Sequence, residues 1–196
     1  MDKIKILALF GESGAGKNTI QRWLATNLDN MHEIISCTTR PKRDYEKEGK
    51  DYYFMDSHDF INKYVSNEIL EFSVFKEWYY GTSLKELKTD KINVGVFNPQ
   101  GVQQLCLQSN IDILPVWIKS NDKTRLLRVL NRESDPDCEE ICRRFLADKD
   151  DFKYLNFDYE IYLNDKNTGD YYGFLNRPKI SEFIKGQNWL IYLSKF

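Results

Sequence analysis

An almost wholly apolar run, Ile4-Lys5-Ile6-Leu7-Ala8-Leu9-Phe10, leads directly into Gly11-Glu12-Ser13-Gly14-Ala15-Gly16-Lys17. The run is typical of a strand buried on both faces of a parallel sheet. The second stretch has two glycines five positions apart and a lysine directly after the second, which is the pattern of a phosphate-binding loop. Glycines let backbone N–H groups turn inward around phosphate oxygens, and the N-terminus of a following helix attracts the same anion. A helical stripe of apolar residues does follow, at Ile20, Trp23, Leu24 and Leu28.

Strands and helices alternate along most of the chain. This alternation predicts an α/β fold, a three-layer core with helices packed on a central parallel sheet. The expected strands are residues 33–37, 92–97, 111–118 and 159–163, and the expected helices are residues 100–108, 124–130 and 139–152.

Residues 40–87 interrupt the alternation, because they are rich in Tyr, Phe, Lys and Glu, with short strand-like segments at 52–55 and 70–75. We expect them to form a small inserted α+β lobe. The chain of 196 residues fits a single domain. Its expected parts are a core of residues 1–38, 89–130 and 146–196, a lobe of residues 39–88 and a short helical lid of residues 131–145. The aromatic tail after Asp165 is expected to pack against the core.

The composition is that of an ordinary globular protein, with 41% hydrophobic and 30% charged residues. The net charge of −2 gives no sign of a nucleic-acid or membrane surface, so an anion would bind at a local site. The four cysteines form no CxxC pair and the two histidines stand in no ligand motif, which favours free thiols over a zinc site. No segment resembles a signal peptide or reaches membrane-spanning length, so we expect a cytoplasmic location. We also expect a monomer or a homodimer.

Further motifs carry a family resemblance. They are Ser36-Cys37-Thr38-Thr39-Arg40-Pro41-Lys42-Arg43, Gly49-Lys50-Asp51-Tyr52-Tyr53-Phe54, Leu70-Glu71-Phe72, Tyr79-Tyr80-Gly81-Thr82 and Pro99-Gln100-Gly101-Val102. With the phosphate-binding loop, they resemble in order and approximate spacing the signature of the guanylate kinases, which are P-loop nucleoside monophosphate kinases. The resemblance covers about residues 4–165. It implies an enzyme that transfers the γ-phosphate of ATP to GMP or dGMP, with Mg²⁺ accompanying ATP.

The acceptor side of such a site must hold a monophosphate that carries nearly two negative charges. Two guanidinium groups, Arg40 and Arg43, can bind it bidentately, and tyrosine hydroxyls can complete the contacts. A carboxylate suits guanine, because guanine offers an adjacent ring N–H and amino group. The resemblance implies that Tyr52 and Tyr80 supply the hydroxyls, and that Ser36, Glu71, Thr82 and Asn98 contact the base.

The donor side is expected at the phosphate-binding loop, with ATP bound by Gly11, Ser13, Gly14, Ala15, Gly16, Lys17, Asn18 and Thr19. By resemblance, Asn164 and the neighbouring Asp165 contact the adenine. In the lid, an arginine can stabilise charge on the transferred phosphoryl group. The family's lid arginines correspond best to Arg132 and Arg144, with Arg128 and Arg143 as weaker candidates. The expected catalytic residues are therefore Lys17, Arg40, Arg132 and Arg144.

Three positions depart from the family pattern. Asn18 stands where a magnesium-binding hydroxyl is usual, so the metal contact falls to the Asn18 amide oxygen or the Thr19 hydroxyl. Val96 replaces a carboxylate close to the metal, and no substitute acid is visible nearby in the sequence. Asn98 replaces a carboxylate that contacts guanine, which weakens one contact by about 1 kcal/mol.

These departures keep two alternatives open. One is a binding module that retains the acceptor cavity for phosphorylated or acidic partners but has lost catalysis, which Asn18 and Val96 favour. The other is a kinase for a different nucleoside monophosphate, which Asn98 favours. The intact Gly16-Lys17 pair argues for an enzyme.

Overall fold

A computed structural model describes residues 3–132, 134–157, 159–163 and 171–184. Its central sheet has five strands in the order β2-β7-β1-β8-β9, and every neighbouring pair is parallel. These strands are β1 (Ile4–Phe10), β2 (Met31–Glu33), β7 (Ile92–Val96), β8 (Ile111–Lys119) and β9 (Glu160–Tyr162). The predicted α/β fold with a central parallel sheet is therefore confirmed.

Helices join these strands or follow the last of them, and polar side chains fix where three of the helices begin. They are α1 (Lys17–Asn27), α3 (Pro99–Cys106), α4 (Asp122–Leu130), α5 (Cys138–Phe152), α6 (Tyr171–Leu175) and α7 (Pro178–Ile184). Asn98, Asn121 and Asp137 each accept a hydrogen bond from the backbone N–H three residues later, so they cap α3, α4 and α5. Such caps satisfy backbone donors that the first turn leaves unpaired.

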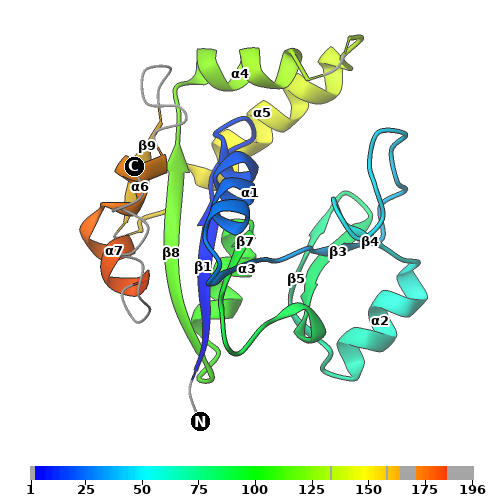
Figure 1. Ribbon diagram of the computed structural model, residues 1–196. Coiled ribbons are helices and arrows are strands. Elements are labelled where there is room, and N and C mark those ends of the chain that lie inside the picture. The colour runs from blue at the N-terminus through cyan, green and yellow to red at the C-terminus, as the bar shows by residue number, and fades with distance from the viewer. Residues whose placement is uncertain (1–2, 133, 158, 164–170, 185–196) are drawn as a thin grey trace.

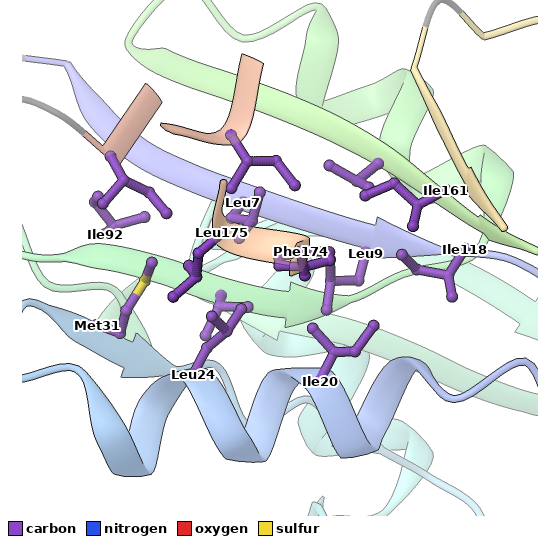
Figure 2. Packing of buried hydrophobic residues seen from close by; sticks show 14 of the residues in the cluster. Leu7, Leu9, Ile20, Leu24, Met31, Ile92, Ile118, Ile161, Phe174 and Leu175 are labelled. Atoms are coloured by element: carbon purple, nitrogen blue, oxygen red, sulfur yellow. The ribbon is translucent and has the colours of Figure 1, made fainter. Parts of the chain in front are cut away.

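The two faces of β1 enter two separate cores, as the pleat of a strand requires. Leu7 and Leu9 pack with α1, α6 and α7 on one face, whereas Ile6, Ala8 and Phe10 pack with α3 and α5 on the other. Figure 2 shows the first of these cores, with Ile20 and Leu24 of α1 facing the strands. Helices on both faces of the sheet give the expected three layers.

The described part of the C-terminal tail completes the first core, as expected. Phe174 and Leu175 of α6 lie among the side chains of β1 and α1 (Figure 2), and Ile180 and Ile184 of α7 are buried with them. The Tyr171 ring stacks on Trp23 of α1 with 4.6 Å between the ring centroids. The aromatic residues beyond position 184 lie outside the described residues.

A second, smaller sheet lies beside the first (Figure 1). It has the strand order β4-β3-β6-β5, with β3 (Cys37–Thr38), β4 (Tyr53–Phe54), β5 (Ile69–Phe75) and β6 (Trp78–Ser83). The helix α2 (Ser57–Val65) covers it through Phe60, and a 3-10 turn, η1 (Leu84–Glu86), leads back to β7. The sequence predicted neither α2 nor β6.

The predicted strand at residues 33–37 is wrong, because this stretch crosses from one sheet to the other. The strand β2 ends at Glu33 in the central sheet, and β3 begins at Cys37 in the small sheet. Between them, the Ile34 N–H donates to Val94 of the central sheet, whereas the Ser36 carbonyl accepts from Tyr53 of the small sheet. The apolar residues suit both sheets, so their pattern did not reveal the break.

Candidate active site

Two glycines of the phosphate-binding loop, residues 11–17, combine a positive φ with a close approach to another part of the backbone. Gly11 has φ of 143°, and a Cβ added there would lie 2.1 Å from the Ile118 carbonyl oxygen. Gly14 has φ of 78°, and its added Cβ would lie 2.5 Å from the carbonyl oxygen of Arg125. The loop therefore lies directly against the backbones of β8 and α4, and both glycines are needed for that approach.

Lys17 is the first residue of α1, and its side chain folds back over the loop. Its Nζ donates to the carbonyl oxygens of Gly11 at 2.6 Å and Glu12 at 2.9 Å. Burial lowers the pKa of Lys17 to about 8, because few water molecules remain to solvate the ammonium. A bound phosphate would add negative charge beside this ammonium and so offset part of the cost of its burial.

One cleft of about 750 Å³ joins three regions that lie far apart in the sequence. Its walls come from the phosphate-binding loop, from the turn that follows β3, and from the ends of α4 and α5. The expected site residues that line it are Ser13, Gly14, Gly16, Lys17, Asn18, Thr19, Ser36, Arg43, Tyr52, Arg132 and Arg144. The cleft lining does not include Gly11, Ala15, Arg40, Glu71, Tyr80, Thr82 or Asn98, while Asn164 and Asp165 lie outside the described residues.

The two acceptor arginines are held by an acid that the sequence analysis missed. The buried Arg40 guanidinium donates to Oε1 of Glu46 at 2.6 Å, and Oε2 of Glu46 accepts from the Arg43 backbone N–H at 2.9 Å. The Arg40 guanidinium also lies 5.6 Å from the centre of the Tyr52 ring, which in turn lies 6.0 Å from the Tyr80 ring. Glu46 lies three residues after Arg43, and this short spacing was a sign in the sequence that the acid could contact the arginine turn.

Glu71 is a buried carboxyl group opposite Thr82 in the β5–β6 pair. Burial raises the pKa of Glu71 to about 7, although Thr82 acts in the opposite direction. An added Cβ at Gly101, in the first turn of α3, would lie 2.6 Å from Oε2 of Glu71. The Gln104 side chain binds both the N–H (3.1 Å) and the carbonyl (2.7 Å) of Phe72, so α3 fixes the strand that carries Glu71.

Asn98 has a structural contact of its own. Its Oδ1 accepts from the Gly101 N–H at 2.8 Å as the N-cap of α3. The side-chain oxygen of Asn98 therefore caps α3, whereas the sequence suggested only a contact between Asn98 and the guanine base.

The lid arginines differ in what they contact. Arg132 is exposed and lines the cleft. Arg144 donates from Nε to Glu140 Oε1 at 2.7 Å, and the same carboxylate binds Arg143 at 2.7 Å and Lys76 at 3.1 Å. Because Lys76 lies between β5 and β6, this cluster connects α5 with the small sheet.

Arg128, a weaker lid candidate, contacts the phosphate-binding loop instead. Its Nη1 donates to the carbonyl oxygens of Gly14 at 3.2 Å and Ala15 at 3.4 Å. This contact places Arg128 behind the loop, on α4.

The residues around the expected metal position offer oxygen ligands. Asn18 and Thr19 are exposed at the start of α1 and line the cleft. Val96 lines it at the end of β7 and offers no ligand. Glu33, at the end of the adjacent strand β2, lines the same cleft, and burial raises its pKa. Amide, hydroxyl and carboxylate oxygens fit a hard cation such as Mg²⁺, and Glu33 is an acid that the sequence analysis overlooked.

Comparison with known proteins identifies the family of this chain. The family model described as guanylate kinase matches residues 3–187, which is nearly the whole chain. The chain belongs to the guanylate kinase family. A guanylate kinase of Helicobacter hepaticus is 32% identical over 174 residues, covering 86% of each chain. One from Mycoplasma genitalium is 30% identical over 187 residues, covering 92% of this chain and 77% of that protein.

The fold has a solved counterpart within the same family. The crystal structure of guanylate kinase from Anaplasma phagocytophilum matches all of this chain and 95% of its own, with a TM-score of 0.65 and 20% sequence identity. At that identity the likeness concerns the fold. Among the described residues, no helix combines the length and the apolar character needed to cross a membrane.

Proposed function

We propose that this guanylate kinase family member transfers the γ-phosphate of ATP to GMP or dGMP, giving ADP and the nucleoside diphosphate. The observation that carries the proposal is the cleft, because one space is lined by the phosphate-binding loop, by Arg43 and Tyr52, and by Arg132 and Arg144. Phosphoryl transfer requires that donor phosphate, acceptor phosphate and charge-stabilising groups meet in this way.

On the donor side, the loop binds the ATP phosphates through backbone N–H groups, and Lys17 neutralises charge on the transferred group. Its ammonium already lies over the loop and is poorly hydrated, so a phosphate gains a strong interaction there. Transfer proceeds directly from donor to acceptor, so it requires no nucleophilic side chain.

On the acceptor side, Arg43 and Tyr52 contact the monophosphate from the cleft wall, and Tyr80 stands beside Tyr52. Arg40 neutralises the same charge and is kept in place by Glu46. The buried Glu71, opposite Thr82, accepts hydrogen bonds from the guanine N–H groups, and Ser36 and Thr82 contribute further contacts to the base. A buried acceptor left without its donors is costly, which selects against adenine.

Lid closure brings Arg132 and Arg144 to the transferring phosphate and excludes water, which limits hydrolysis of ATP. Asn18, Thr19 and Glu33 would hold the Mg²⁺ that accompanies ATP. The metal supplies positive charge to the phosphate oxygens. Substrates of this kind suit a cytoplasmic enzyme.

An assay of ADP release, run with GMP, dGMP, AMP, CMP and dTMP in turn, tests the proposal. We expect turnover with GMP or dGMP, and a loss of at least about 100-fold in Lys17→Ala, since one preorganised charge contact is removed. GMP binding should survive that substitution. If no monophosphate is phosphorylated while GMP still binds, the protein is a binding module. If a non-guanine nucleotide is preferred, the role of Glu71 is wrong.

A further inference from the structure

Two side chains from different helices hold the backbone of Ser13 in the phosphate-binding loop. Asp148 of α5 accepts the Ser13 N–H through Oδ2 at 2.6 Å. Arg125 of α4 donates from Nε to the Ser13 carbonyl oxygen at 3.0 Å. The two side chains also bind each other, with 3.2 Å between Arg125 Nη2 and Asp148 Oδ2. We call this pair the Ser13 bracket.

Both members of the bracket are charged, and Arg125 is buried while Asp148 is partly buried, so losing their contact would be costly. The Arg125 side chain is 1% exposed and that of Asp148 is 18% exposed. The remaining donor of Arg125, Nη1, lies 3.1 Å from Asp122 and 3.6 Å from Glu12, and its guanidinium stacks 4.9 Å from the Phe145 ring. Removing one charged side chain of such a pair leaves the charge of the other without its partner, which is costly where that charge is shielded from water.

The bracket also explains how the loop is pressed into place. The added Cβ at Gly14 would collide with the Arg125 carbonyl oxygen, so the backbone of α4 touches the loop where the Arg125 side chain binds it. Asp148 does not line the cleft, whereas Ser13, Gly14 and Gly16 do. Arg125 also lines the cleft, so within the pair only the Asp148 carboxylate acts from outside the cleft lining, through the Ser13 N–H.

Asp148 influences the donor site electrostatically as well. Burial is the largest influence on the pKa of Lys17 and lowers it, and the negative charge of Asp148 is the largest influence that raises it. By itself, the negative charge of Asp148 would repel the ATP phosphates and weaken ATP binding. The salt bridge to Arg125 and the hydrogen bond from the Ser13 N–H offset this repulsion. Asp148 can therefore favour ATP binding only by fixing the position of the loop.

We propose that Arg125 and Asp148 are positioning residues for the ATP site, which hold the Ser13 peptide so that the phosphate-binding loop is preformed before ATP arrives. The proposal rests on the proposed function for its ligand, ATP. The same bracket ties the loop to α4 and α5, the two helices that flank the segment bearing Arg132. The same contact therefore links the loop to both helices that border the lid.

Two variants of one residue separate the position of the loop from charge. Both Asp148→Asn and Asp148→Ala remove the negative charge, but only the asparagine keeps an oxygen that accepts from the Ser13 N–H. We expect D148A to bind ATP about fivefold more weakly than D148N, which is the factor that one hydrogen bond produces. GMP affinity should be equal in both. Asp150→Ala, an exposed position on α5, controls for the charge change on this helix.

Hydrogen exchange gives a readout that a general loss of stability does not produce. The Ser13 amide should stay protected in the wild type and in D148N, and should exchange faster in D148A while the amides of β1 keep their protection. Equal ATP affinity of D148A and D148N, or tighter binding by D148A, would overturn the proposal. Tighter ATP binding by D148A would mean that the Asp148 carboxylate occupies the position that an ATP phosphate takes in the complex.

If D148A does not fold, Arg125→Lys decides instead. Lysine keeps the charge but lacks the planar group that reaches Ser13 and Asp148 together. Because Arg125 itself lines the cleft, support for the bracket requires both severalfold weaker ATP binding and faster exchange of the Ser13 amide, with GMP binding unchanged. Unchanged ATP binding, or weaker ATP binding with full protection of the Ser13 amide, refutes it. A wild-type protein that binds ATP but phosphorylates no monophosphate refutes the proposed function and leaves this binding test intact.

Discussion

The buried Glu71 makes a quantitative prediction about how GMP binding depends on pH. Burial raises the pKa of its carboxyl group to about 7, whereas the N–H donors of guanine favour the ionised form. Below pH 7 the group must release a proton before it can accept both donors, so GMP affinity falls as pH falls. Lowering the pH from 8 to 6 takes the ionised fraction from about nine tenths to about one tenth, which weakens binding about tenfold.

Titration calorimetry at pH 6, 7 and 8 measures this, with Glu71→Gln as the matched control. Glutamine does not titrate, so the variant retains only the second ionisation of the phosphate of GMP, with a pKa near 6, which contributes about a twofold change over the same range. The wild type should therefore lose about twentyfold in affinity and E71Q about twofold. Parallel pH profiles for the two proteins would refute the assignment of Glu71 to the base.

Protein stability provides an independent check of the same pKa. Since the pKa of Glu71 is raised from 4.5 to about 7 in the folded state, the folded protein binds more protons than the unfolded chain between these values. Its contribution to stability is present below pH 4.5 and is lost as pH rises through 7. The free energy of unfolding of the wild type, relative to E71Q, should thus fall by about 1.4 kcal/mol per pH unit in this window. Urea titrations without nucleotide measure it, and a constant difference between the two proteins would show that the carboxyl group is not buried as described.

Three further substitutions test other parts of the site. Gly11→Ala forces a Cβ to within 2.1 Å of a main-chain oxygen of β8, whereas Gly49→Ala at φ of 67° meets nothing closer than 3.5 Å; urea unfolding should show a loss of about 1 kcal/mol for G49A and clearly more for G11A, and equal losses would contradict the close contact. Val96→Asp should lower the Mg²⁺ concentration needed for half-maximal turnover, because it adds a carboxylate to the cleft; an unchanged requirement places the metal elsewhere. Arg144→Ala should reduce kcat by about 10³-fold. Arg143→Ala removes an arginine of the same cluster that does not line the cleft, so it should leave kcat nearly unchanged. Similar losses of kcat in the two variants would show that Arg144 does not stabilise the transferred phosphoryl group.

The parts of the fold that the sequence predicted are those set by neighbouring residues. The strand β1, the phosphate-binding loop and the helix α1 follow one another without a gap, and the glycine positions state the backbone geometry directly. The family motifs likewise lie within short segments. Their order along the chain was enough to predict a guanine nucleotide as acceptor, while the alternation of strands and helices predicted the α/β fold.

Strand pairing was harder, because it depends on partners far along the chain. Residues 33–37 look like one apolar strand, yet hydrogen bonds to Val94 and Tyr53 divide them between two sheets. The strand β6 is likewise defined by its pairing with β3 and β5. A local pattern of apolar residues cannot indicate which of two sheets a residue joins.

At the site, the chemistry of single residues was visible in the sequence, but their environment was not. The sequence contains Glu71, but its raised pKa comes from burial beside β6 and α3. It contains Arg125 and Asp148, twenty-three positions apart on two helices, but only the packing of both helices against the loop brings them to Ser13. Burial and long-range contacts arise from the whole fold, so the tertiary structure decided which charges are shielded from water and which backbone groups they hold.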